Sequence, residues 1–353
     1  MPHQALEPGF FGANLVRAVG LLCYEMEGTK AWKSPSTSRR HKFGKEGQEI
    51  RSPVEDIRDK AIIGPKEVAS LNFIRHPCKF AFRRHYRTGL RSHIVEVLLP
   101  EQLSRERKGV IRNGVKIFPK PKPLRILRLF RAKFFSLKDA LTEIHTVKVV
   151  ESYLAPLYMA MSEEFLVHYR VSGKFHIMLC GLQLYLPGEI LNPWSPVEED
   201  PLAFLTHSLA LSMGLPSESF AKLLSSARSH LKEFVKRIKQ MMRHAGYIPD
   251  LAGVGNLILT EAGRVCLVDI NNISKVSFGP NIPLDDRGYP VCDKSIAALA
   301  ALEHKWLGKA PYTNDPIYKE FLTPSRVARV RELEKAFYQR GGNLSSSLSP
   351  SPE

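Results

Sequence analysis

The residues most able to do chemistry lie close together in the second half of the chain, in the stretch YIPDLAGVGNLILTEAGRVCLVDINNIS. Asp250 and Asn256 stand in a loop, and Asp269 directly follows the apolar run Val265–Val268. Two short strand-like runs with a glycine turn separate Asn256 from Asp269, so we expect the three side chains at strand and loop ends around one point. Oxygen ligands of this kind suit Mg²⁺, which proteins hold with one or two carboxylates plus substrate phosphates. The pattern therefore predicts a magnesium site for phosphoryl transfer, which needs a metal and a carboxylate near the attacking hydroxyl.

This stretch resembles the catalytic region of the protein-kinase-like superfamily, and specifically its atypical bacterial and small-molecule or lipopolysaccharide-kinase branches. The family pattern is a catalytic aspartate, an asparagine a few residues later, and a metal-binding aspartate at the end of the next hairpin. The separation of thirteen positions between Asn256 and Asp269 fits that hairpin. The resemblance implies that Asp250 is the catalytic aspartate and that Asn256 and Asp269 bind the metal.

An earlier stretch, PLRILRLFRAKFFSLKDALTEI, is similar to the third strand, loop and C-helix of the same superfamily. The resemblance places Glu143 at the helix glutamate and Arg128 at the strand lysine, although arginine and lysine are not interchangeable. Lys116, on the preceding predicted strand, is an alternative source of the ammonium group. The segment from Gln183 to Tyr185 resembles the hinge that would receive the adenine of ATP through backbone groups.

Several residues depart from the family pattern. Asp250 and Asn256 are one residue further apart than usual, Ile248-Pro249 replaces the His-Arg of H-R-D, and D-F-G reads Asp269-Ile270-Asn271. No A-P-E motif follows, so the expected acceptor is a hydroxyl of a small molecule, sugar or glycan rather than a protein. The departures also leave a second interpretation open. In it the protein is a pseudokinase, a catalytically degenerate module for nucleotide binding or regulation.

The elements expected to position these residues make an α+β chain, with helices predicted from three- and four-residue spacing of apolar residues and strands from short apolar runs. The expected strands span residues 93–99, 115–118, 124–130, 164–169, 175–185, 257–259 and 265–268, and the expected helices span 202–213, 219–244, 295–306 and 324–339. A further helix is expected after Ser136, which is a candidate N-cap with Asp139 three residues later.

Together with the resemblance, this order predicts a two-lobed protein-kinase-like fold. It has a small β-rich N-lobe with one helix, a larger and mostly helical C-lobe, and ATP with Mg²⁺ bound between them. The expected boundaries are a basic flexible segment at 1–60, the N-lobe and hinge at 61–185, the C-lobe at 186–340 and a disordered tail at 341–353.

The charge of the chain is concentrated in its first third. The formal net charge is +16, and residues 30–133 hold 27 Lys and Arg against 9 Asp and Glu. Such a field favours an anionic partner. A third reading is therefore a basic binder of nucleic acid or an anionic membrane surface, in which the arginines among residues 83–91 (FRRHYRTGLR) take part.

The rest of the composition narrows the class of protein. Five cysteines without a C-x-x-C pair argue against a disulfide scaffold or a cysteine zinc site, and no apolar run reaches the roughly 18 residues of a membrane span. No G-x-S-x-G elbow or H-E-x-x-H motif is present. The sequence predicts a cytoplasmic protein.

Overall fold

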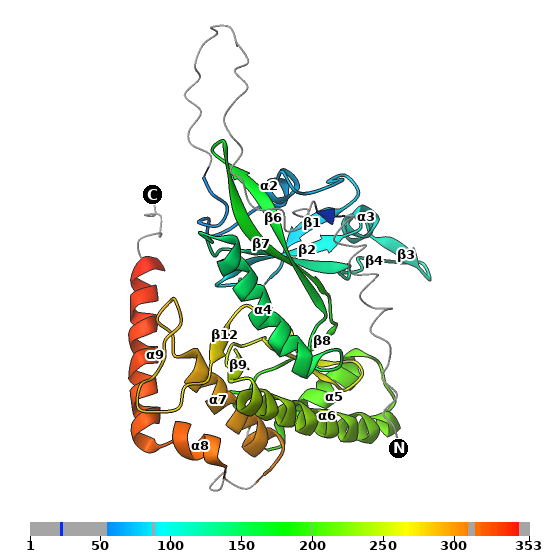
Figure 1. Ribbon diagram of the computed structural model, residues 1–353. Coiled ribbons are helices and arrows are strands. Elements are labelled where there is room, and N and C mark those ends of the chain that lie inside the picture. Colours follow the sequence, from blue (N-terminus) through cyan, green and yellow to red (C-terminus); the bar gives the residue numbers. More distant parts are fainter. Residues whose placement is uncertain (1–21, 24–54, 87–88, 198, 310–314, 346–353) are drawn as a thin grey trace, which may run out of the picture. The chain divides into compact units, whose positions relative to one another are not determined.

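The computed structural model describes residues 22–23, 55–86, 89–197, 199–309 and 315–345. The chain is a mixed α/β protein that divides into two compact units (Figure 1). Unit 1 is drawn from residues 1–144 and 162–185, and unit 2 from residues 145–161 and 186–353. Residues 145–161, which the sequence analysis assigned to the N-lobe, therefore cluster with the second unit.

Unit 1 is built on a five-stranded antiparallel sheet with the order β1-β2-β5-β7-β6. Its strands are β1 (Ala81–Arg84), β2 (Ser92–Leu98), β5 (Arg125–Phe130), β6 (Ser162–Val171) and β7 (Lys174–Leu184). The predicted hairpin at residues 164–185 is β6 and β7, and its turn residues Ser172 and Gly173 both have positive φ, 49° and 78°. This pair of angles is typical of a type I′ turn.

The other elements of unit 1 surround this sheet. They are α2 (Pro65–Ala69), α3 (Pro100–Lys108), the separate hairpin β3 (Val110–Arg112) and β4 (Val115–Ile117), and the start of α4 (Leu137–Leu154). The predicted cap of α4 is confirmed, because the Asp139 backbone N–H donates to Ser136 Oγ at 3.2 Å and the Ser136 hydroxyl donates to Asp139 Oδ2 at 2.7 Å.

The two faces of the sheet pack against different elements, because successive side chains along each strand point to opposite faces. Leu127 and Leu129 of β5 join a cluster with α2 and the segments before β1. Phe130 points to the opposite face, where it packs with Leu179 of β7 and with Ala140 of α4. The helix therefore covers the face of the sheet that carries every second residue of β5, including Arg128.

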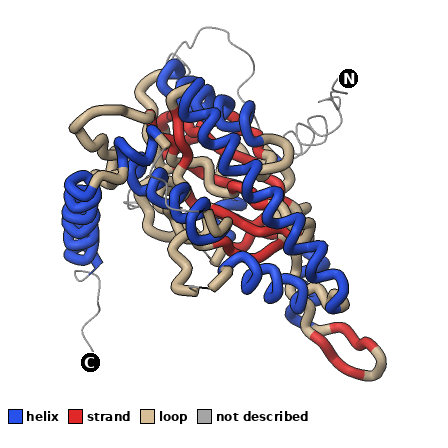
Figure 2. The backbone as a smooth tube through the Cα atoms, turned by 90° about the horizontal axis from the view of Figure 1, so that it is seen from below, coloured by secondary structure: helices blue, strands red, loops and turns tan. Residues whose placement is uncertain are grey.

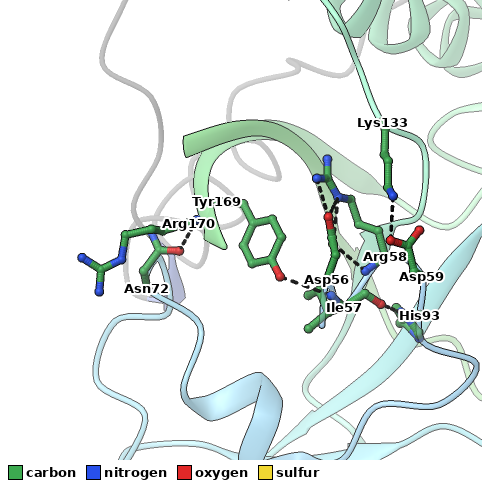
Figure 3. A network of polar contacts seen from close by, with 9 residues as sticks. All are labelled: Asp56, Ile57, Arg58, Asp59, Asn72, His93, Lys133, Tyr169 and Arg170. Atoms are coloured by element: carbon green, nitrogen blue, oxygen red, sulfur yellow. Dashed lines mark hydrogen bonds and ion pairs between the residues drawn. The ribbon is translucent and has the colours of Figure 1, made fainter. Parts of the chain in front are cut away.

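Residues 56–59 are held against unit 1, although their composition predicted a flexible segment (Figure 3). The Ile57 N–H donates to the Tyr169 hydroxyl at 3.2 Å, and His93 Nε2 lies 2.7 Å from the Ile57 carbonyl oxygen. Arg58 forms an ion pair with Asp56 at 2.7 Å and lies 5.4 Å from the centre of the Tyr169 ring. Ile57 and Arg58 are buried, and their contacts order this segment although most residues around them are polar. Residues 24–54 lie outside the described part of the chain.

Unit 2 is mostly helical. Its elements are β8 (Gly188–Leu191), α5 (Pro201–Ser212), α6 (Ser217–His244), β9 (Tyr247–Pro249), β10 (Leu257–Thr260), β11 (Val265–Leu267), β12 (Ile273–Lys275), α7 (Val291–Ala301), the π-helical turn η1 (Leu302–Trp306), α8 (Pro316–Phe321) and α9 (Pro324–Ser345). Strands β11, β10 and β8 form one antiparallel sheet, and β9 pairs with β12. The helices and the β10–β11 hairpin predicted from the sequence are confirmed, whereas β8, β9, β12 and α8 were not predicted. The tail predicted to be disordered at 341–353 is wrong for residues 341–345, which continue α9, and residues 346–353 lie outside the described part of the chain.

The core of unit 2 is organised around α6. Its apolar stripe includes Leu231, Phe234, Val235 and Ile238, each 1% exposed or less. Three- and four-residue spacing places these side chains on one face of the helix, where they pack with the β10–β11 hairpin and α7. Among the described residues, no helix is long and apolar enough to cross a membrane.

A buried ion pair connects α7 with α9. Arg326 Nε lies 2.5 Å from Asp293 Oδ1, and the two residues are 8% and 2% exposed. The same guanidinium also donates to the Gly279 carbonyl oxygen. This pair fixes the start of α7, the helix that carries Ser295.

We predict that Asp293→Ala lowers the free energy of unfolding by about 3–5 kcal/mol, because it leaves the Arg326 charge buried without its carboxylate. Glu332→Ala is the matched control, since it breaks an exposed i,i+3 pair with Arg329 of α9 and should cost less than about 1 kcal/mol. Urea unfolding measures both. Equal effects of the two substitutions would contradict the prediction.

Candidate active site

The loop that carries Asp250 is fixed at both sides by backbone contacts within unit 2. Strand β9 ends at Pro249, which stands opposite Ile273 of β12. The Asp250 N–H continues this pairing by donating to the Asn272 carbonyl oxygen at 2.8 Å. The next N–H, of Leu251, donates to Ser295 Oγ on α7 at 3.2 Å. The loop therefore starts from a strand pair and is anchored on a buried helix.

Asp250 and Asn256 are held together by the loop between them. The Asp250 carboxylate accepts the N–H groups of Ala252 and Gly253, at 2.9 and 3.1 Å, in an Asx-type turn. Asn256 Nδ2 donates to the backbone carbonyl oxygen of Asp250 at 2.9 Å.

Asp269 is joined to the same loop from the other side. The Val268 N–H donates to the Asn256 carbonyl oxygen at 2.8 Å, and Asp269 Oδ1 accepts the Asn271 N–H at 3.0 Å. Burial, and then the negative charge of Asp269, raise the pKa of Asp250 to about 6. The structure thus brings Asp250, Asn256 and Asp269 to one place.

The donor set fits a magnesium ion. The amide nitrogen of Asn256 is used in the bond to Asp250, so its Oδ1 is the atom suited to ligation together with the Asp269 carboxylate. Amide and carboxylate oxygens are ligands that Mg²⁺ accepts, and water and substrate phosphates complete such shells. Within the described ranges, no group of three or more His, Cys, Asp or Glu side chains gathers to hold a metal. A metal at this place would therefore depend on Asn256 and on a bound phosphate.

Gly253 and Gly255 are needed for this geometry. A Cβ on Gly253 would lie 2.5 Å from Asn256 Nδ2 and 2.9 Å from its Oδ1. Gly255 has φ of 94°, which is unfavourable for any residue with a side chain. The missing side chain at Gly253 therefore makes room for the Asn256 amide.

Two aromatic residues that the sequence analysis did not select lie beside the loop. Trp194 Nε1 donates to the Ala252 carbonyl oxygen at 2.8 Å, and Lys294 Nζ lies 4.7 Å from the centre of the Trp194 ring. The Tyr289 hydroxyl donates to Glu334 at 2.8 Å. They come from segments far along the chain, and no local pattern marks them.

Tyr289 is also electrostatically linked to the loop. Burial raises the pKa of its hydroxyl, the Glu334 carboxylate raises it further, and the charge of Asp250 contributes in the same direction. Lys294 forms an ion pair with the same Glu334 at 2.9 Å. Tyr289 therefore connects Glu334 of α9 and Lys294 of α7 electrostatically with Asp250.

Arg128, one of the residues of unit 1 that were predicted to bind the nucleotide, belongs to a buried polar group within the sheet. Arg128 is 2% exposed and forms an ion pair with Glu164 of β6 at 3.0 Å, and both side chains bond to Ser162 Oγ. The register sets Arg128 and Glu164 on either side of Gly181 in β7. A Cβ on Gly181 would lie 3.2 Å from Arg128 Nη2, so the glycine gives this pair its space.

The remaining predicted residues are spread over unit 1. Glu143 is half-buried on α4, on the helix that covers the Arg128 face of the sheet. Lys116 is exposed on β4, whereas the strand beside β5 in the sheet is β2. Gln183 is 4% exposed on β7, and the half-buried Tyr185 follows that strand.

The chain is similar to solved structures only at the level of the backbone fold. No protein-family model and no curated protein matches the chain. Among solved structures, the chain matches one described as the ROP18 kinase domain in complex with AMP-PNP and sucrose, with 8% identity and a TM-score of 0.31. The match covers 68% of this chain and 66% of that one, just under two thirds of its length.

We predict that Asp250→Asn stabilises the metal-free protein at alkaline pH. The pKa of Asp250 is raised from 3.8 to about 6, so between about pH 4 and pH 6 the folded state keeps a proton that the unfolded chain releases. The free energy of unfolding of the wild type should therefore fall as pH rises through this window. At about pH 8 the variant should be more stable by about 1–3 kcal/mol, and the difference should shrink towards about pH 4.

Urea unfolding in EDTA at several pH values measures this difference. Asp286→Asn is the control, because Asp286 is an exposed carboxylate of the same unit. A difference between Asp250→Asn and wild type that stays constant with pH would contradict the raised pKa.

We predict that Gly253→Ala lowers the free energy of unfolding by about 1–3 kcal/mol, because the added Cβ must displace the Asn256 amide and with it a bond to Asp250. The matched control is Gly64→Ala, where the nearest atom to the added Cβ is 3.4 Å away and the stability should be unchanged or slightly higher. Urea unfolding and the amide NMR signals of Asn256 report the change. Unaltered Asn256 signals in Gly253→Ala would refute the steric argument.

Proposed function

We propose that the protein is an ATP- and Mg²⁺-dependent phosphotransferase of kinase-like fold that acts on a hydroxyl of a small molecule, sugar or glycan. The observation that carries the proposal is the closeness of Asp250, Asn256 and Asp269. The Asn256 amide bonds to Asp250, the Val268 N–H next to Asp269 bonds to the Asn256 carbonyl oxygen, and the charge of Asp269 acts on Asp250. The order β5, α4, then the β6–β7 hairpin also agrees with the family resemblance.

In this proposal each residue has a distinct task. Asn256 and Asp269 would hold Mg²⁺, which supplies charge neutralisation for the nucleotide phosphates. Asp250 would orient the acceptor hydroxyl or take its proton. A pKa near 6 suits a general base, whose pKa should lie near the operating pH. The backbone N–H groups of Ala252 and Gly253 would keep its carboxylate in one orientation.

The nucleotide residues of unit 1 enter the proposal as supporting groups. Glu143 would act with Arg128 on the phosphates, and the segment from Gln183 to Tyr185 would receive the adenine through its backbone. Lys116, the predicted alternative to Arg128, lies on the separate β3–β4 hairpin and is given no role here. The absence of an A-P-E motif from the sequence favours a small hydroxyl acceptor over a protein. A sugar or glycan is one such acceptor.

The decisive experiment is calorimetry of ATP binding with and without Mg²⁺, combined with transfer assays against a panel of sugars, glycans and small alcohols. We predict that Asp269→Ala lowers the Mg²⁺-dependent affinity for ATP at least about tenfold, because it removes a metal ligand. Asp250→Asn should keep the affinity and lower transfer by about 10²–10⁴-fold.

Asp286→Asn is again the control, and it should leave both binding and transfer unchanged. ATP affinity that does not depend on Mg²⁺ or on Asp269 would refute the assignment of the metal site. Transfer that survives Asp250→Asn would refute the role of Asp250 alone.

A second candidate function is a nucleotide-binding or regulatory module without transfer. The buried ion pair of Arg128 with Glu164 favours it, because a guanidinium engaged within the sheet is less able to contact phosphate than an exposed lysine. This candidate predicts Mg²⁺-dependent ATP binding that requires Asp269, no transfer by the wild type, and no effect of Asp250→Asn in any transfer assay.

A further inference from the structure

The hairpin β3–β4 is an insertion that is not part of the five-stranded sheet of unit 1. It lies in the chain between β2 and β5, which pair directly with each other. Its turn residues Asn113 and Gly114 have φ of 50° and 74°, the angles of a tight type I′ turn. The hairpin projects from the rest of unit 1 and is the pair of strands at the lower right of Figure 2.

Three large apolar side chains of this hairpin face solvent. Ile111, Val115 and Phe118 are 76%, 61% and 60% exposed. An isolated two-stranded hairpin is marginal in water, and these side chains add nothing to the core of unit 1. Several exposed apolar residues gathered on one projecting element mark an interaction site more often than scattered ones do.

Cations surround these apolar residues. Residues 105–122 hold seven Lys and Arg against one acid, Glu106, and Glu106 is paired with Arg83 at 3.0 Å. The strand register sets Ile111 opposite Lys116 and Val115 opposite Arg112. Each exposed apolar side chain of the strands therefore stands beside a cation.

A groove at the base of the hairpin continues the positive surface. It has a volume of about 480 Å³ and is formed by α3, the hairpin and the segment after β4. Its lining includes four cationic side chains, those of Arg105, Arg112, Lys120 and Lys122. Within the described part of the chain, Arg105, Arg112 and Lys120 form no ion pair. The groove has the size and charge to take a phosphate headgroup.

We propose that this insertion binds the surface of an anionic phospholipid bilayer. Ile111 stands opposite Lys116, whose Nζ lies 5.6 Å from the centre of the Phe118 ring, whereas Val115 lies on the other face of the hairpin. Ile111 and Phe118 would enter the interfacial layer, and the surrounding cations would contact lipid phosphates and carboxylates. Charge complementarity and apolar insertion are the two terms of peripheral membrane binding. Exposed aliphatic side chains favour lipid over nucleic acid, because single-stranded nucleic acid is bound by aromatic stacking and cations. The proposal is independent of phosphotransferase activity.

The test is flotation of the full chain with vesicles of phosphatidylcholine alone and with about 30% phosphatidylserine. The wild type should bind the anionic vesicles preferentially. Ile111→Ser with Phe118→Ser should lower the partition coefficient by about tenfold to a hundredfold. Arg112→Gln with Lys120→Gln should lower it by about thirtyfold, since each cation near the surface contributes about 1 kcal/mol.

Matched controls separate the hairpin from other exposed and basic segments. Phe204→Ser removes a 64% exposed phenylalanine of α5, and Arg331→Gln with Lys335→Gln removes two exposed cations of α9. Both controls should bind vesicles like the wild type. All these side chains are exposed, so circular dichroism should show each variant folded.

Three results would overturn the proposal. Vesicle binding that the hairpin variants do not reduce would assign binding to another segment. Loss of affinity for a short single-stranded RNA, with vesicle binding unchanged, would assign the surface to nucleic acid. Full competition by soluble glycerophosphoserine, with no effect of the apolar variants, would assign the groove to a free phosphate compound and not to a bilayer.

Discussion

The closeness of two carboxylates, those of Asp250 and Asp269, is the constraint on which the candidate site depends. Asp250 and Asp269 are close enough for one to raise the pKa of the other, and in a low-dielectric setting such repulsion is costly. Backbone N–H groups of Ala252, Gly253 and Asn271, with the amide of Asn256, oppose it. A divalent cation would oppose it further. The proposed binding of a metal ion by Asn256 and Asp269 would explain why the loop keeps two carboxylates together at this cost.

The loop is tied both to the strand pair of β9 with β12 and to the helical core of unit 2. The Leu251 N–H is bonded to Ser295 of α7, and α7 is joined to α9 through Asp293 and Arg326. Each of these contacts is buried and joins segments that are distant in the chain. The position of Asp250 is consequently set by the packing of the helical core, and substitutions in α9 can act on the site without contacting it.

The local parts of this design could be predicted from the sequence and the distant parts could not. The β10–β11 hairpin was predictable because apolar runs, a glycine turn and the spacing of Asn256 and Asp269 all lie within a short stretch. The partner of Arg128 was not, because Glu164 is brought to it only by the pairing of β5 and β6 with β7. Gly181, a glycine inside an apolar strand, was the available signal of a bulky pair above it. Ile57 and Arg58 were missed because composition averages over the few residues that are buried.

The insertion between β2 and β5 shows how a surface can be added without disturbing such a framework. The register of β2 with β5 runs without interruption from Ser92–Phe130 to Val97–Arg125, so α3 and the β3–β4 hairpin leave the strand that carries Arg128 in place. The cations that alternate with Ile111 and Val115 also protect the open edges of the hairpin from pairing with another chain, as charged residues on edge strands do. The same charges would then have two roles: they would keep the hairpin from pairing with another chain in water, and they would attract it to an anionic bilayer.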